Sequence, residues 1–118
     1  MIIRPAIESD AAAIWGIIAP VIRAGETLTL DRDMTEHDAL AYWFGADKEA
    51  FVAEDGGVVL GTYYLRANQT GGGGHVANAG YVTGAGATGR GIARAMGLHS
   101  IEHAKARGAK IYAELIGY

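Results

Sequence analysis

Apolar side chains between residues 11 and 22 recur at the spacing of one helical face. These positions are Ala13, Ile14, Ile17, Ile18, Val21 and Ile22. Ser9 or Asp10 is placed to cap the start of this helix, and we expect Pro20 to kink or shorten it. A second, shorter helix is expected after Thr35, which together with Asp38 resembles a capping box. This helix contains Leu40, Trp43 and Phe44. We expect the aromatic side chains of Trp43, Phe44 and Trp15 to lie in the core.

Other stretches follow the period of two that is typical of strands. Residues 1–7 predict a short strand with Pro5 near its edge or end, and residues 50–67 predict a hairpin around Glu54–Gly57. Residues 75–83 form a further strand, with Asn78 and Val82 on one face and Tyr81 and Thr83 on the other. Tyr63 and Tyr64 are expected on alternate strand faces, one in the core and one in a cleft. A helix over 91–107 and a last strand over 109–116 complete the order β-α-α-β-β-β-α-β.

Composition restricts the functions that this chain can have. A length of 118 residues suits one domain over 1–118, and 50% hydrophobic residues are enough to bury a core. With a net charge of −3, the chain has no basic field to attract nucleic acid or acidic lipid. The absence of cysteine excludes disulfides, thiolate catalysis and cysteine metal sites. We find no signal peptide and no apolar run long enough to span a membrane, so we expect a cytoplasmic protein.

Glycines concentrate where the third strand meets the last helix, over residues 84–91. Unpaired N–H groups and the positive end of the dipole make a helix start a phosphate site, and glycines let the backbone come close. Gly84, Gly86 and Gly89 match G-x-G-x-x-G of dinucleotide-binding proteins, whereas Gly91 and Ala93 match the end of the acyl-CoA loop pattern Q/R-x-x-G-x-G/A. The loop alone leaves both interpretations open.

The residues that follow the loop do not fit a dinucleotide-binding domain. The stretch is similar to the opening of a short-chain dehydrogenase, but only 27 residues follow Gly91, too few for the rest of that sheet. The acidic residue that binds the ribose is expected about 20 residues after the glycines. Glu114 lies 25 residues after Gly89, and the Tyr-x-x-x-Lys pair of that family is absent.

The element order resembles the GNAT superfamily of N-acetyltransferases across nearly the whole chain. The hairpin over 51–65 is similar to the second and third strands of that family, with Gly61 at a position where it usually has glycine. Thr88 stands where the loop pattern has Gln or Arg, and the neighbouring Arg90 partly compensates. Residues 23–44 look most like the amino-acid and phosphinothricin-type enzymes. The resemblance implies an α/β fold of the α+β type, with a mixed, mostly antiparallel sheet flanked by helices.

The resemblance also implies a function, a metal-independent transfer of acetyl from acetyl-CoA to a small-molecule amine by direct attack. The pantetheine arm would enter a gap between the strand ending at Val82 and Thr83 and the last strand near Ile111, and pair with the earlier strand. Backbone N–H groups would hold the pyrophosphate, and one strand N–H would stabilise the oxyanion. The residues implied in cofactor binding are Val82, Thr83, Thr88, Gly89, Arg90, Gly91, Ile92 and Ala93.

Candidates for the acceptor side rest on position alone. Glu26 and Thr27 lie between the first two helices, where similar proteins bind the acceptor, and an ordinary surface role is equally compatible. His75 is a candidate base, and Asn78 could order a catalytic water or make a structural hydrogen bond. His99 and His103 have a metal-ligand spacing without an evident third ligand, so a polar helix face is the simpler interpretation.

The chain is short at its C-terminal end relative to the family, which usually continues with another helix and two strands. A truncated chain, a partner chain that completes the sheet and a remnant that binds coenzyme A without turnover are three open explanations, and we favour a homodimer that buries the open sheet edge. Two alternatives remain at this point, a catalytically inactive CoA-binding interaction module and a fragment of an NAD(P)-binding oxidoreductase.

Overall fold

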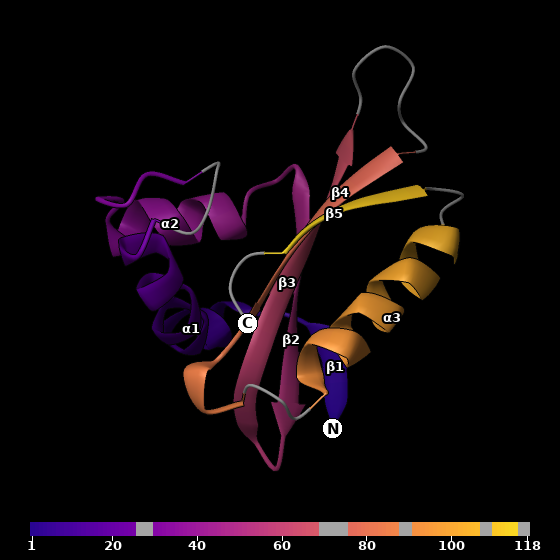
Figure 1. The fold of residues 1–118 in the computed structure, drawn as a ribbon, viewed down its shortest axis with the longest axis horizontal. Helices are drawn as coiled ribbons and strands as arrows, with labels where there is room; N and C mark the ends of the chain where they lie inside the picture. The colour runs from indigo at the N-terminus through magenta and orange to yellow at the C-terminus, as the bar shows by residue number, and fades with distance from the viewer. Residues whose placement is uncertain (26–29, 69–75, 88–90, 107–109, 116–118) are drawn as a thin grey trace.

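A computed structural model describes residues 1–25, 30–68, 76–87, 91–106 and 110–115 (Figure 1). Its elements are β1 (Ile2–Pro5), α1 (Ala11–Arg23), α2 (Glu36–Trp43), β2 (Lys48–Asp55), β3 (Val58–Asn68), β4 (Val76–Thr83), α3 (Ile92–Ala106) and β5 (Lys110–Leu115), with short 3-10 turns at Glu8–Asp10 and Ala85–Ala87. The strands form a sheet in the order β1-β2-β3-β4-β5. Neighbours are antiparallel except for the parallel pair β4–β5. The predicted element order and the mixed, mostly antiparallel sheet are confirmed.

The starts of the first two helices differ in how they are capped. Thr35 caps α2 as predicted, because its hydroxyl accepts a hydrogen bond from the N–H of Asp38. Asp10 precedes α1 but does not cap it, since its carboxylate accepts two bonds from Arg4 and one from the N–H of Ile7. The bond from Arg4 lowers the pKa of Asp10. Helix α1 continues through Pro20 to Arg23, so the proline does not end it.

The hairpin of β2 and β3 turns at Gly56 and Gly57, which have φ angles of 59° and 83°. Such left-handed angles favour glycine, which explains why this sequence signal was reliable. On the sheet, alternate residues of β3 face opposite sides. Tyr63 and Tyr64 do alternate, but their exposures of 0% and 3% show that both are buried, so the prediction that one lines an open cleft was wrong.

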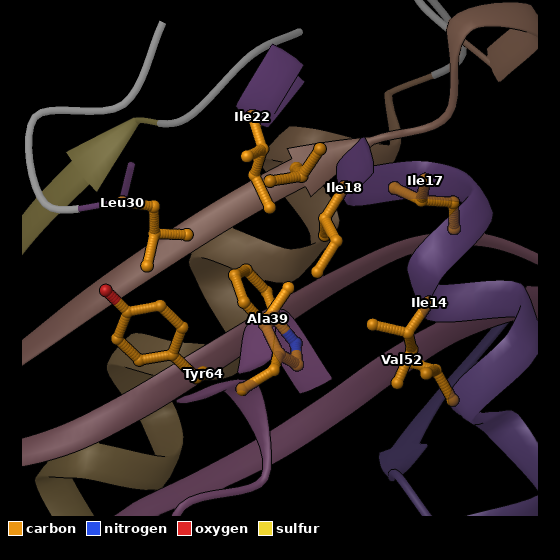
Figure 2. Packing of buried hydrophobic residues seen from close by; sticks show 10 residues of the cluster. Ile14, Ile17, Ile18, Ile22, Leu30, Ala39, Val52 and Tyr64 are labelled. Carbon is orange, nitrogen blue, oxygen red and sulfur yellow. The ribbon is translucent and has the colours of Figure 1, made fainter. Parts of the chain in front are cut away.

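Each face of the sheet is covered by its own helices (Figure 1). Helices α1 and α2 cover one face with a cluster dominated by isoleucines, where Ile14, Ile18 and Ile22 pack with Trp43 and Tyr64 (Figure 2). The prediction that Trp43 is a core residue is confirmed, whereas Trp15 and Phe44 are only partly buried.

Helix α3 covers the opposite face with a second cluster. The members of this cluster are Phe51, Ala53, Tyr63, Leu65, Ala79, Tyr81, Ala87, Ile92 and Met96. Gly61 lets α3 approach, because a Cβ atom there would lie 3.0 Å from both Ile92 Cγ2 and Met96 Cε. Since α3 connects the parallel strands β4 and β5, its N-terminus lies beside the end of β4. In the described parts of the chain, no helix is long and apolar enough to cross a membrane.

Candidate functional site

Strand β4 extends further than its pairing with β5. The six residues of β5 pair with β4 from Val76–Lys110 to Tyr81–Leu115, so Val82 and Thr83 pair with β3 but not with the described part of β5. The sequence predicted separation near Ile111, and this was wrong, because Ile111 pairs with Ala77 inside the sheet. The end of β4 is therefore where the described strands part.

The backbone N–H and C=O groups of Thr83 point toward the β5 side of β4, away from β3. Gly84 donates its N–H to Leu60 O of β3 at 2.8 Å. Backbone groups of successive strand residues point alternately to the two neighbouring strands. The N–H and C=O of Thr83 therefore face the β5 side, beyond the last β4–β5 pair, Tyr81–Leu115. A ligand with an amide group could pair there as a further strand would.

The start of α3 lies directly after this strand end. Gly91 has a φ angle of 75°, and its C=O accepts the N–H of Ala95 as the first helical bond. The N–H groups of the preceding helical residues consequently have no partner within the helix, which suits an anion. Ile92 is 2% exposed and anchors the helix in the core, so only its backbone is available to a ligand. Ala93 is exposed.

Several predicted site residues lie outside the described part of the chain. These are Glu26, Thr27, His75, Thr88, Gly89 and Arg90. Their roles in donor and acceptor binding stay predictions. The described members of the predicted set are brought together at the end of β4 and the start of α3, except for Asn78, which lies near the other end of β4.

Asn78 belongs to a polar row that crosses the sheet. In register, Lys48 of β2 lies opposite Arg66 of β3, and Arg66 lies opposite Asn78. The row is on the face covered by α1 and α2, because Tyr64 and Val82, two and four residues along, belong to that core cluster. Asn78 is half-buried and Arg66 is exposed. Lys48 and Arg66 thus lie on the same face of the sheet as Asn78, the face covered by α1 and α2.

Aromatic rings hold the lysine of this row in place. The Lys48 side chain is 4% exposed, and its Nζ lies 3.8 Å from the centre of the Tyr42 ring and 3.1 Å from Asp47 Oδ1. This hydrogen bond lowers the pKa of Asp47. The hydroxyl groups of Tyr42 and Tyr64 form a hydrogen bond of 3.3 Å. These side chains were not predicted as a group, although the period of two through residues 62, 64 and 66 was a usable signal.

A separate polar network lies beneath α3. Tyr63 OH bonds His99 Nδ1 at 2.5 Å, and His103 Nε2 bonds Glu49 Oε2 at 2.9 Å. Burial lowers the pKa of His99 and raises that of Tyr63. Each imidazole thus has a protein partner, and the described residues contain no group of three side chains suited to a metal. This network lies on the sheet face away from Asn78.

The chain belongs to the acetyltransferase (GNAT) family, whose model matches residues 21–116. A GCN5-related N-acetyltransferase from Kribbella flavida is 34% identical, with a TM-score of 0.84, over 93% of this chain and 68% of that one. An N-acetyltransferase from Staphylococcus aureus Mu50 is 26% identical (TM-score 0.81), over 95% of this chain and 71% of that one. A putative acetyltransferase from Salmonella typhimurium, solved with its cofactor acetyl-CoA, shares the fold at 23% identity (TM-score 0.81; 96% and 68% covered). No curated protein matches the chain.

This membership decides between the two interpretations of the glycine loop. Dinucleotide-binding domains of the Rossmann type use an open, mostly parallel sheet. Here β4 and β5 form a parallel pair, whereas β1–β2, β2–β3 and β3–β4 are antiparallel. The oxidoreductase alternative is therefore set aside, and the acetyltransferase interpretation remains together with the alternative of an inactive CoA-binding module.

Proposed function

We propose that the protein transfers the acetyl group of acetyl-CoA to a small-molecule amine by direct attack. The observation that carries the proposal is the end of β4, where Val82 and Thr83 extend beyond the last described β4–β5 pair and lead toward the N-terminus of α3. A strand edge suits the amides of pantetheine, and a helix start suits pyrophosphate. The strand edge and the helix start follow each other along the chain, as the pantetheine and pyrophosphate groups follow each other in CoA.

On the donor side, the backbone of Thr83 pairs with the pantetheine arm, and the first N–H groups of α3 receive phosphate oxygens. Ala93 is small and exposed, so it does not obstruct a phosphate. Thr88, Gly89 and Arg90 are proposed to continue this cradle. No metal is needed, because the helix start and Arg90 supply the positive charge.

On the acceptor side, Asn78 is proposed to order a water molecule that takes the proton from the amine, with His75 as an alternative base. Glu26 and Thr27 are proposed to bind the acceptor ammonium group. Arg66 lies opposite Asn78 in the sheet register and Lys48 lies one strand further, and both cations are paired with Asp47.

The chemistry needs no covalent enzyme intermediate. The neutral amine attacks the thioester carbonyl, and a strand N–H stabilises the oxyanion of the tetrahedral intermediate. The C–N bond forms, the C–S bond breaks, and the CoA thiolate leaves and takes up a proton. A chain without cysteine is compatible with this route.

A charge introduced at the helix start tests the donor site. In Ala93→Asp, a carboxylate near the first N–H groups of α3 stabilises the helix but repels phosphate. We expect acetyl-CoA binding and thiol release with an amine panel to fall at least tenfold while the melting temperature is retained. Leu98→Asp is the matched control, since Leu98 is on the same helix and 56% exposed. Equal loss in both variants, or in neither, would contradict the proposed site.

Turnover separates an enzyme from an inactive binding module. Acetyl-CoA binding without thiol release across the amine panel would favour the module.

A homodimer through the outer edge of β5 stays a prediction, supported by the pairing of the described β5 with β4 along one side. Light scattering that gives a monomer mass would contradict it. A cytoplasmic location likewise stays a prediction.

A further inference from the structure

We propose that the side-chain hydroxyl of Thr83 is a positioning group for the acyl donor, and that it donates a hydrogen bond to an oxygen of the bound donor. This inference rests on the proposed function, since it assigns a further role at the same cleft. It concerns the hydroxyl alone, which is distinct from the backbone pairing of the same residue.

The hydroxyl of Thr83 is buried without a partner. The residue is 6% exposed, and among the described side chains its Oγ1 is the one buried polar atom without a hydrogen bond. Other buried hydroxyls nearby are satisfied. Thr62 Oγ1 accepts from Trp43 Nε1 and donates to Phe51 O, while Ser100 Oγ donates to Gly97 O at 2.7 Å. Since an unbonded buried hydroxyl destabilises the protein, the Thr83 group calls for an explanation.

The position of Thr83 supplies an explanation for its unbonded hydroxyl. In the sheet register it lies opposite Gly61, the residue over which Ile92 and Met96 pack, so its side chain is on the face covered by the start of α3. Its backbone N–H and C=O face the β5 side of β4, beyond the last described pair, Tyr81–Leu115. Thr83 thus joins the strand edge to the helix start, between the two features proposed to hold the donor.

A small movement is enough to bring the hydroxyl to a ligand. Rotation about the Cα–Cβ bond exchanges the hydroxyl and methyl groups of threonine between staggered positions. The oxygen can then turn toward the strand edge when a donor oxygen arrives there. The acceptor is either an amide carbonyl of pantetheine or a pyrophosphate oxygen, both of which take a hydrogen bond from a hydroxyl.

Valine has the shape of threonine without the hydroxyl, which makes Thr83→Val a direct test. Because the hydroxyl has no hydrogen-bond partner among the described residues, we expect the melting temperature of this variant to equal or exceed that of the wild type. We expect its Kd and KM for acetyl-CoA to rise about three- to tenfold, the effect of one hydrogen bond, with kcat little changed. Thr83→Ser retains the hydroxyl and should restore affinity to within about twofold of the wild type.

Thr62→Val is the matched control, because it removes a buried threonine hydroxyl that does have partners. It should lower the melting temperature, in contrast to Thr83→Val. Adenosine 3′,5′-bisphosphate, which lacks pantetheine and the pyrophosphate link, should bind the wild type and Thr83→Val equally.

Three results would overturn the inference. A fall in melting temperature for Thr83→Val as large as for Thr62→Val would show that the hydroxyl has a structural partner. An unchanged Kd for acetyl-CoA would show that the donor does not use the hydroxyl, while leaving the proposed function intact. If the wild type itself fails to bind acetyl-CoA, the proposed function fails and the inference fails with it.

Discussion

The two faces of the sheet are stabilised by different means. Beneath α1 and α2, the core is mainly aliphatic, and the Trp43–Thr62 pair is a buried side-chain hydrogen bond there. Beneath α3, Tyr63 and Tyr81 extend their hydroxyls to His99 and Ser100 on the helix. Both faces contain hydrogen bonds, but the α1–α2 face is mainly aliphatic, whereas on the α3 face two helix side chains bond directly to tyrosines of the sheet.

This difference follows from the amino acids that each helix brings to the sheet. Helix α1 contributes four buried isoleucines, whereas α3 buries Ser100 and carries His99 near its middle and His103 in its last turn. Burial of a polar group requires a hydrogen-bond partner, which fixes the relative position of helix and strand more narrowly than apolar contact does. Helix α3 also begins at the proposed donor site, so its hydrogen bonds to Tyr63 and Tyr81 help to position the helix start.

The largest expected effect comes from the aliphatic face. Replacing the fully buried Trp43 with alanine should lower the free energy of unfolding by about 3–5 kcal/mol, because it leaves a cavity and removes the donor to Thr62. Trp43→Phe, which keeps a large ring but lacks the N–H, should cost less. Urea denaturation monitored by circular dichroism measures both. A cost below about 1 kcal/mol for the alanine variant would contradict the proposed importance of shape on this face.

The close contact at Gly61 should give the next effect, on the α3 face. Gly61→Ala places a methyl group 3.0 Å from Ile92 and Met96, which are themselves tightly packed, so we expect a loss of about 1–3 kcal/mol. Gly97→Ala is the control on α3, where a Cβ meets no atom within 4 Å and helix propensity predicts stabilisation of up to about 1 kcal/mol. Equal melting temperatures for the two variants would show that α3 is not held closely against β3.

The smallest expected effect is a pH dependence of the same face. Burial lowers the folded-state pKa of His99 below its ordinary value of 6.5, so folding favours the neutral imidazole. This contribution is present above about pH 6.5 and is lost as the pH falls toward the folded pKa. Tyr63, His103 and Phe51 surround the ring. The melting temperature should therefore fall less between pH 7.5 and 5.5 in His99→Gln than in the wild type, while the exposed His37→Gln should behave like the wild type.

Much of the fold was predictable because its signals are local. The Gly56–Gly57 turn needs positive φ, Thr35 caps α2, and the isoleucine spacing of α1 marks its buried face. Such features depend on neighbours in sequence, which a pattern can show. The β4–α3 junction was predictable for the same reason.

Features that depend on distant residues were not predictable. Asp10 was expected as a cap, but its carboxylate bonds Arg4, whose guanidinium is in turn held by the distant Glu54 of β2. Lys48, Arg66 and Asn78 come together through strand register over some thirty positions, and the period of two gives faces but not register. The partners of His99 and His103 lie on β3 and β2, so their helical spacing, interpreted as a polar helix face, did not show that both imidazoles bond to the sheet.

Thermal denaturation with acetyl-CoA and, in parallel, NADPH tests the central claim most directly. A ligand at a hundred times its Kd stabilises the folded state by about 2.7 kcal/mol. For a chain of this size, this corresponds to a rise in melting temperature on the order of ten degrees. The donor cleft at the end of β4 predicts a rise with acetyl-CoA and none with NADPH. A rise with NADPH alone, or no rise with either, would contradict it.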